Sequence, residues 1–346
     1  MGHENGLHVG LIGAGRIGAF HARTLAGLAG VASVAIADAD PGRAERVAEE
    51  LGVRGIETPE ALVESGVDAL VIATATPGHA PLLRLAARAG LPAFCEKPVA
   101  LDLATLDRVL EDVARTGILV QVGFQRRFDA GYRAAHDAVS TGALGRILVM
   151  RAATHDPSPP SEDYIAASGG IFRDLHIHDF DAVRFVSGEE VAEVYADGAA
   201  LEATWLEQYG DVDASAAVLR LTGGGLVIVS GTRHDPLGYD VRLEVFGIAD
   251  SVAVGQDGRT PMRSVEPGVD RPPGPGYRDF LDRFEPAYRS ELAAFVASVR
   301  SGEASACPLD EARAALSVAL AADRSRAERR PVSVEEVGLA HMPSSR

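Results

Sequence analysis

The sequence predicts an α/β protein in which a doubly wound parallel sheet is followed by a second region with a mostly antiparallel sheet. Short apolar runs alternate with helical patterns from Leu7 to Gly123, as in parallel strands joined by helices. A glycine-rich turn connects the first of these strands to the first helix. After Gly188 the pattern changes to a succession of strand-like runs.

Length and composition limit the possible functions. The chain has 346 residues, 47% hydrophobic and 24% charged, which is an ordinary globular balance and argues against disorder. The formal net charge of -16 argues against nonspecific binding to nucleic acid or to an anionic membrane. No apolar run reaches the roughly 18 residues of a membrane span. The 2 cysteines suit a reducing compartment, so we expect a cytoplasmic protein.

The first strand and helix carry a dinucleotide-binding motif. A short apolar strand, Leu7 to Ile12, leads directly into Gly13-Ala-Gly-Arg-Ile-Gly18, and Ala19 to Leu28 reads as a helix. This is the strand–turn–helix context that the G-x-G-x-x-G pattern requires. The glycines allow the turn, the approach of a pyrophosphate and close helix packing, and the helix N-terminus offers free N–H groups. We expect the dinucleotide to contact Gly13, Gly15, Arg16, Ile17 and Gly18.

The second strand, Val31 to Ala37, ends at an acidic residue that predicts the choice of cofactor. Asp38 follows Gly18 by about 20 residues, the usual distance to the carboxylate that accepts hydrogen bonds from the ribose. A carboxylate there would repel a 2′-phosphate, so we expect NAD rather than NADP. Arg43 is the nearby cation that could soften this preference. Asp38 could also serve a strand-end turn, and the two interpretations are compatible.

The loop after the strand Asp68 to Ala73 is expected beside the cofactor. Loops that follow the carboxyl ends of parallel strands line the ligand crevice of such sheets. Thr76 and Pro77 lie in this loop and should therefore border the cofactor. For His79, which follows them, a structural role at the start of the next helix is the simpler interpretation.

The next strand, Leu91 to Cys95, delivers Glu96-Lys97-Pro98 to the same edge of the sheet. Lys97 is the only lysine in the chain, so lysine is not used here for surface charge. A compact ammonium at this position can stabilise a developing alkoxide, whereas the alternative is a surface lysine before a helix. A cis peptide bond before Pro98 would aim the lysine.

A change of pattern near Gly123 predicts a domain boundary. The segment Phe124-Gln-Arg-Arg-Phe-Asp129 interrupts the alternation of strands and helices. We assign residues 1–124 to cofactor binding and residues 125–346 to substrate binding and subunit contacts. For the second region we predict strands at 146–154, 191–196, 214–221, 226–232 and 239–246, and helices at 277–300 and 309–328.

The segment from Ser168 to Val186 carries a candidate acid–base pair. Two glycines permit a tight turn, and the apolar spacing then predicts one helix that stops at Gly188. Asp174 and His178 are four residues apart and would share a face of that helix. A carboxylate beside an imidazole fixes its tautomer and favours its protonated form, which suits a general base for an alcohol. An exposed ion pair is the competing interpretation.

The glycine motif, the Glu96-Lys97-Pro98 turn and the Asp174-x-x-x-His178 segment resemble, in order and spacing, the glucose–fructose oxidoreductase and inositol dehydrogenase (Gfo/Idh/MocA) family. The resemblance covers nearly the full length. It implies a Rossmann domain followed by an α/β domain with a large open sheet, whose face commonly mediates dimers and tetramers. It is strongest to the inositol-oxidising members, through the segments at 121–132, 168–174, 177–181 and 238–242.

This resemblance implies the NAD-dependent oxidation of a secondary hydroxyl of a cyclic polyol, with myo-inositol and its 2-keto form as the expected substrate and product. It implies that Lys97, Asp174 and His178 are catalytic and that Glu96 lies at the cofactor site. Arg127, His155 and Tyr239 match positions near the polyol. We expect no metal, because the chemistry needs none and no cysteine–histidine spacing indicates one.

Other functions remain open. The chain could oxidise or reduce a sugar, or another inositol or aminocyclitol intermediate, because specificity rests on a few residues of such a fold. It could also be a nucleotide-sensing regulator without catalysis, or a structural partner in an oligomer. The presence of Lys97, Asp174 and His178 argues against these last two functions.

Overall fold

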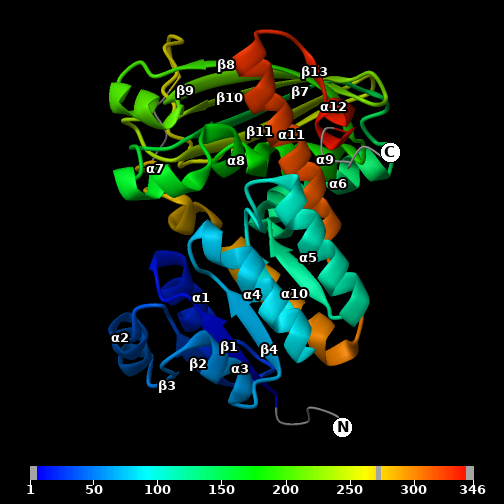
Figure 1. The fold of residues 1–346 in the computed structure, drawn as a ribbon. Helices are drawn as coiled ribbons and strands as arrows, with labels where there is room; N and C mark the ends of the chain where they lie inside the picture. Colours follow the sequence, from blue (N-terminus) through cyan, green and yellow to red (C-terminus); the bar gives the residue numbers. More distant parts are fainter. Residues whose placement is uncertain (1–5, 270–273, 340–346) are drawn as a thin grey trace, which may run out of the picture. The chain divides into compact units, whose positions relative to one another are not determined.

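The computed structural model describes residues 6–269 and 274–339. The chain forms two compact units (Figure 1). The first comprises Met1–Gln125 and Tyr288–Arg313, and the second comprises Arg126–Ala287 and Ala314–Arg346. The first unit therefore includes a late segment of the chain, which the expected division after residue 124 grouped with the second region.

The first unit contains a 6-stranded parallel sheet in the order β3-β2-β1-β4-β5-β6. This is the strand order of a dinucleotide-binding Rossmann fold, so the predicted doubly wound sheet is confirmed. Its elements are β1 (Leu7–Ile12), α1 (Arg16–Ala26), β2 (Val31–Ala37), α2 (Pro41–Leu51), β3 (Arg54–Gly55), α3 (Pro59–Glu64), β4 (Ala69–Ile72), α4 (Thr76–Ala89), β5 (Ala93–Glu96), α5 (Leu103–Thr116) and β6 (Val120–Gly123).

The core of the first unit depends on a helix from late in the chain. The central strands are buried on both faces, as a parallel sheet covered by helices requires. Residues 288–301 of α10 (Phe280–Ser301) belong to this unit. Their side chains Leu292, Phe295 and Val296 are packed into the same cluster as the apolar residues of β1, β2 and β4.

The second unit contains a 7-stranded sheet in the order β12-β11-β7-β10-β9-β8-β13. Among the described strands of this second sheet only the β7–β10 pair is parallel, which confirms the prediction of a mostly antiparallel sheet. Figure 1 shows α7, α8 and α9 along one face of this sheet. The elements are η1 (Gln125–Phe128), α6 (Ala130–Ser140), β7 (Ile147–His155), α7 (Glu162–Ser168), α8 (Ile171–Asp174), α9 (Ile177–Ser187), β8 (Val191–Ala199), η2 (Thr204–Tyr209), β9 (Ala214–Leu221), β10 (Leu226–Thr232), β11 (Asp240–Gly247), β12 (Ser251–Val254), α11 (Leu309–Glu328), β13 (Val332–Ser333) and α12 (Val334–Leu339).

The single helix predicted between Ile171 and Gly188 is wrong, because the structure has two helices there. α8 ends at Asp174, α9 begins at Ile177, and the His176 N–H donates to the carbonyl of Ile171, five residues back. This wider turn interrupts the regular hydrogen-bond pattern, a feature that is frequent at functional sites. It coincides with a buried His176 side chain whose Nε2 lies 2.8 Å from the hydroxyl of Ser215 on β9.

A buried ion-pair network joins the helices of the second unit to its sheet. Arg126 in η1 donates to Asp179 of α9 across 2.5 Å and to the Thr154 hydroxyl of β7 across 2.9 Å. Asp179 also accepts from Thr154 at 2.8 Å, and its second oxygen lies 2.7 Å from Nδ1 of His176. Burial opposes the charge, but Arg126 and His176 hold the pKa of Asp179 below its usual value.

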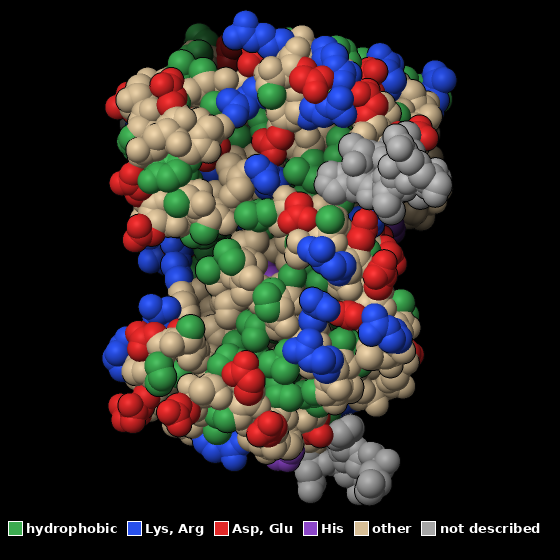
Figure 2. Space-filling model, in the orientation of Figure 1, with side chains coloured by type: hydrophobic (Ala, Val, Ile, Leu, Met, Phe, Trp, Pro, Cys, Tyr) green, Lys and Arg blue, Asp and Glu red, His purple; other side chains and the backbone are tan. Residues whose placement is uncertain are grey.

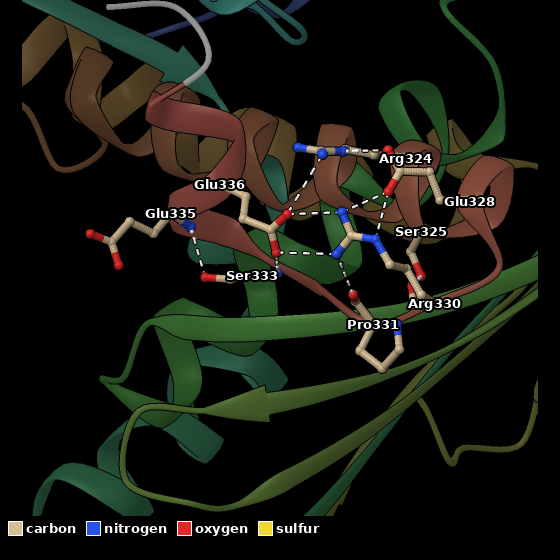
Figure 3. A network of polar contacts seen from close by, with 8 residues as sticks. All are labelled: Arg324, Ser325, Glu328, Arg330, Pro331, Ser333, Glu335 and Glu336. Atoms are coloured by element: carbon tan, nitrogen blue, oxygen red, sulfur yellow. Dashed lines mark hydrogen bonds and ion pairs between the residues drawn. The ribbon is translucent and has the colours of Figure 1, made fainter.

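The end of the chain that the structure describes is fastened to the edge of the same sheet. Arg330 donates to Glu328 at the end of α11 (2.6 Å) and to Glu336 in α12 (2.9 Å), as Figure 3 shows. Ser325 of α11 accepts a hydrogen bond from the Ala196 N–H of β8 at 2.9 Å. β13 pairs with β8 beside it. These contacts extend the sheet beyond β8.

On the face shown in Figure 2, acidic and basic side chains are interspersed over the surface. Within residues 6–269 and 274–339, the structure has no helix whose length and hydropathy would let it cross a membrane.

We expect Arg126→Ala to lower the free energy of unfolding by about 3–5 kcal/mol, because it leaves the buried Asp179 carboxylate without its cation. The Asp179 pKa is lowered in the folded state, so this contribution should persist above about pH 4 and fade as the pH falls below it. Urea unfolding at several pH values measures both effects. Arg23→Ala, which breaks an exposed pair with Glu50, is the control and should cost at most about 1 kcal/mol. Equal losses in the two variants would contradict the proposed importance of the network.

Candidate active site

The glycines of the turn between β1 and α1 are of two kinds: two have no room for a side chain, and one faces open space. A Cβ on Gly13, whose φ is +104°, would lie 2.5 Å from the Ala73 carbonyl oxygen, and one on Gly18 would lie 1.7 Å from that of Gly13. The fold itself therefore requires these two glycines. A Cβ on Gly15 would meet nothing within 4 Å. This leaves room for a pyrophosphate at the N-terminus of α1, where Arg16 and Ile17 form the first turn.

Asp38 braces the glycine turn from the end of β2. Its Oδ2 accepts a hydrogen bond from the Ala14 N–H at 2.6 Å, and its Oδ1 accepts one from the Asp40 N–H at 2.9 Å. Nη1 of Arg43 lies 3.5 Å from Oδ1. A carboxylate can accept about four hydrogen bonds, so this bracing leaves capacity for ribose hydroxyls.

The loop after β4 is tied to the loop after β5 by His79. α4 begins at Thr76 and has Pro77 in its first turn. The ring nitrogens of His79 lie 2.8 Å from the Pro98 carbonyl oxygen and 2.9 Å from that of Thr74. Burial lowers the pKa of His79, although both carbonyl contacts favour the charged ring. His79 therefore joins the loop after β4 to the loop after β5, in keeping with the structural role expected for it.

Glu96 and Lys97 stand at the end of β5. The buried Glu96 carboxylate lies 2.7 Å from Nε2 of His21 on α1, and its second oxygen accepts the Lys97 main-chain N–H at 3.3 Å. The peptide bond between Lys97 and Pro98 is cis, as the sequence suggested. The pairing of Glu96 with His21 was not expected from the sequence.

In the second unit, two of the expected polyol residues meet at one end of the sheet. His155 ends β7, pairs with Asp240 of β11, and has Nδ1 3.1 Å from the Thr232 hydroxyl of β10. Burial lowers the pKa of His155. Tyr239 directly precedes β11, and its N–H donates to the Tyr277 carbonyl at 2.6 Å. Burial raises the pKa of the Tyr239 hydroxyl, so this group is a neutral donor.

Asp174 is bound by two residues that the sequence analysis did not single out as site residues. Its Oδ1 accepts the Tyr164 hydroxyl at 2.7 Å, and its Oδ2 lies 3.4 Å from the buried Arg233 guanidinium. Arg233 also lies 3.3 Å from Asp211. The Asp174 charge and burial raise the pKa of Tyr164 well above its usual value. Arg233 follows β10 directly, so its position at a strand end was the signal that could have identified it.

Arg127 in η1 is held by an ion pair with α9. Its guanidinium makes two parallel contacts with the Asp181 carboxylate of α9, at 2.9 and 2.6 Å. His178 lies one turn earlier on the same helix and is partly exposed. The second unit therefore holds Arg127, Asp174 and His178 on adjoining helical segments, whereas Lys97 belongs to the first unit.

The chain matches two family models that together cover most of its length. Residues 7–124 match the oxidoreductase family with an NAD-binding Rossmann fold, and residues 132–253 match the GFO/IDH/MocA C-terminal domain. These two segments correspond to the parallel and the mostly antiparallel sheet.

Similar proteins resemble the chain over almost their whole length. The myo-inositol 2-dehydrogenase of Thermotoga maritima is 38% identical over 96% of this chain and 99% of its own. The inositol 2-dehydrogenase of Rhizobium meliloti is 40% identical over 94% of this chain and 98% of its own. A crystal structure of scyllo-inositol dehydrogenase from Lactobacillus casei, with bound NAD(H) and scyllo-inositol, has a TM-score of 0.87 at 28% identity and covers 95% of this chain and 99% of that one.

Both family models, the full-length relatives and the open glycine turn lead to the same assignment. The chain belongs to the GFO/IDH/MocA family of oxidoreductases and uses NAD as its cofactor.

Proposed function

We propose that this protein oxidises a secondary hydroxyl of a cyclic polyol with NAD, and that its substrate is myo-inositol, which becomes 2-keto-myo-inositol. The observation that carries this proposal is the similarity to inositol 2-dehydrogenases at 38% and 40% identity over nearly the whole chain. The presence of Lys97, Asp174 and His178 supports a catalytic function over that of a regulator without catalysis.

Each residue of the catalytic trio has a separate role in this proposal. Bound NAD supplies the acceptor for the hydride of the alcohol carbon. His178 takes the proton of the hydroxyl on that carbon, so that the alcohol becomes a ketone. Asp174, held by Tyr164 and Arg233, favours the charged form of the His178 ring. Lys97 stabilises the negative charge that develops on the substrate oxygen.

The polyol contacts would come from side chains whose positions are already fixed. Arg127 would contribute its guanidinium from η1, where the Asp181 carboxylate orients it. His155 and Tyr239 add groups from the end of the sheet. We propose that residues 125–346 bind the substrate in this way and that residues 1–124 bind the cofactor through the glycine turn, Asp38, Thr76, Pro77 and Glu96.

The bound scyllo-inositol of the Lactobacillus casei enzyme favours a second candidate substrate, scyllo-inositol. A panel of inositol stereoisomers and sugars, assayed with NAD and with product identification, tests both candidates. Turnover of a sugar in preference to every inositol would overturn the proposed substrate.

We also propose that the second-unit sheet assembles subunits into a dimer or tetramer, in the cytoplasm. Tyr195, Val218 and Ile228 are aligned across β8, β9 and β10, and each is 44–46% exposed. Arg151 and Glu244 continue this row across β7 and β11. An exposed apolar row with a charged pair at one end suits a self-complementary interface.

Asp38→Ala should narrow the difference in kcat/KM between NAD and NADP, because it removes the carboxylate that would repel the 2′-phosphate of NADP. Arg43→Ala should have the opposite effect. It removes the cation beside Asp38 and should widen the difference in kcat/KM between NAD and NADP. The measurement is kcat/KM with each cofactor. Equal efficiency with NAD and NADP in the unmodified protein would rule out this role for Asp38.

His178→Ala should lower turnover by roughly 10²–10⁴-fold, the usual effect of a lost general base, and leave NAD affinity nearly unchanged. Asp174→Asn should move the rising limb of the pH–rate profile to lower pH, because the protonated ring loses the stabilising charge. A structural role would instead give a less stable protein whose folded fraction turns over normally. Turnover, pH profile and NAD affinity of folded protein separate the two roles.

Val218→Lys should reduce the oligomer to smaller species, because it places charge in the middle of the exposed apolar row. Glu111→Lys, on the exposed side of α5, is the control and should leave the assembly unchanged. Light scattering at micromolar concentration gives the mass of each variant. A monomeric unmodified protein would contradict the proposed assembly.

A further inference from the structure

A buried cluster of three ionisable side chains lies inside the first unit. His21 comes from α1, Glu96 from the end of β5 and Glu291 from the late helix α10, with exposed fractions of 0%, 7% and 0%. One polar atom of each lies within 4.8 Å of the others. The Gln121 side chain of β6 donates to the Glu291 carbonyl at 2.7 Å and so fixes the helix at this point.

The charges in this cluster do not balance if both carboxyl groups are ionised. His21 is 2.7 Å from Glu96, but neither carboxyl oxygen of Glu291 has a hydrogen-bond partner among the described residues. Aromatic rings pack edge-on against His21, among them those of Tyr288, with ring centroids 5.7 Å apart, and Phe94, with centroids 5.6 Å apart. Burial, and after it the charge of Glu96, raise the pKa of Glu291 well above its usual value.

Side chains of these types also bind divalent cations, but the geometry favours a proton. With zinc–ligand distances of about 2.0–2.2 Å, two ligands in a tetrahedral site are separated by about 3.3–3.6 Å. The distance between Nε2 of His21 and Oε1 of Glu96 is 2.7 Å, which is that of a charge-assisted hydrogen bond. A proton on Glu291 removes the remaining repulsion between the two carboxyl groups.

The cluster is linked directly to the proposed NAD site. The second oxygen of Glu96 accepts the main-chain N–H of Lys97 at 3.3 Å. His21 lies on α1, whose N-terminus is the glycine turn. The His21–Glu96 pair therefore connects the helix that receives the pyrophosphate to the strand end that carries Lys97.

We propose that Glu291 is a positioning residue of the NAD site: as a neutral acid it allows Glu96 to hold both His21 and the Lys97 main chain, and as an anion it would repel Glu96 and loosen that segment. This proposal rests on the proposed location of Glu96 and Lys97 beside the cofactor. The charged or titratable groups that face Glu291 are His21 on α1 and Glu96 on β5, with Tyr288 of its own helix against His21.

The test compares the unmodified protein with Glu291→Gln, which keeps the shape of the side chain and removes its ionisation. Glu285→Gln, at an exposed position of the same helix, is the matched control. Infrared difference spectra at neutral pH should show that Glu291→Gln loses a carboxylic-acid C=O band, whereas Glu285→Gln loses a carboxylate band.

The dissociation constant for NAD, measured without polyol, should rise about tenfold toward alkaline pH in the unmodified protein and in Glu285→Gln, the scale that a buried like-charge pair can produce. It should stay nearly constant in Glu291→Gln.

Three outcomes would overturn the proposal: loss of a carboxylate band in Glu291→Gln, parallel pH dependence of NAD affinity in all three proteins, or a stoichiometric divalent metal that Glu291→Gln loses. Glu291→Leu, which also cannot ionise, replaces the glutamine variant if that variant does not fold. Polyol turnover enters none of these measurements, so failure of the proposed substrate would be seen separately.

Discussion

The buried carboxylate of Asp179 is the interaction on which the second unit depends. It binds Arg126, Thr154 and His176 at once, and these three residues come from η1, β7 and the break between α8 and α9. His176 then reaches Ser215 on β9. A single carboxylate thus fixes the helices that carry Asp174 and His178 against the sheet. Because the group is fully buried, each of its partners is needed to offset the cost of taking its charge out of water.

The contact between His176 and Ser215 has a matching requirement in the sheet. A Cβ on Gly231 of β10 would lie 2.5 Å from the His176 ring, so only glycine leaves room for the imidazole there. Ser215, His176 and Asp179 have the residue types and order of contacts of a hydrolase triad, but all three are buried. Their burial makes the constellation a packing device that orients α9 rather than a nucleophile.

Local sequence signals predicted most of the fold, and they were enough to propose the dinucleotide half of the candidate site. The glycine turn, Asp38 and the Glu96-Lys97 strand end follow from spacing, since the carboxyl ends of parallel strands meet at one edge of the sheet. Contacts between distant segments could not be predicted in this way. Nothing local distinguishes the buried His176 from His178 two residues later, and Arg233, the partner of Asp174, is 59 positions away. The break in the helix follows from the buried His176 contacts, which periodicity does not encode.

The assignment of residues 288–313 to the first unit limits how this protein can be divided by recombination. Leu292, Phe295 and Val296 fill the core beside the strands of the parallel sheet, although some 170 residues separate Gln121 from Glu291 along the chain. A gene fragment that stops after β6 would encode all six strands of the parallel sheet but none of these core side chains from α10. The cofactor-binding half is therefore not a contiguous cassette, and a chimaera that exchanges it must also exchange the later helical segment. Exchanges that preserve function would have to be made at three crossover points, near residues 125, 287 and 313.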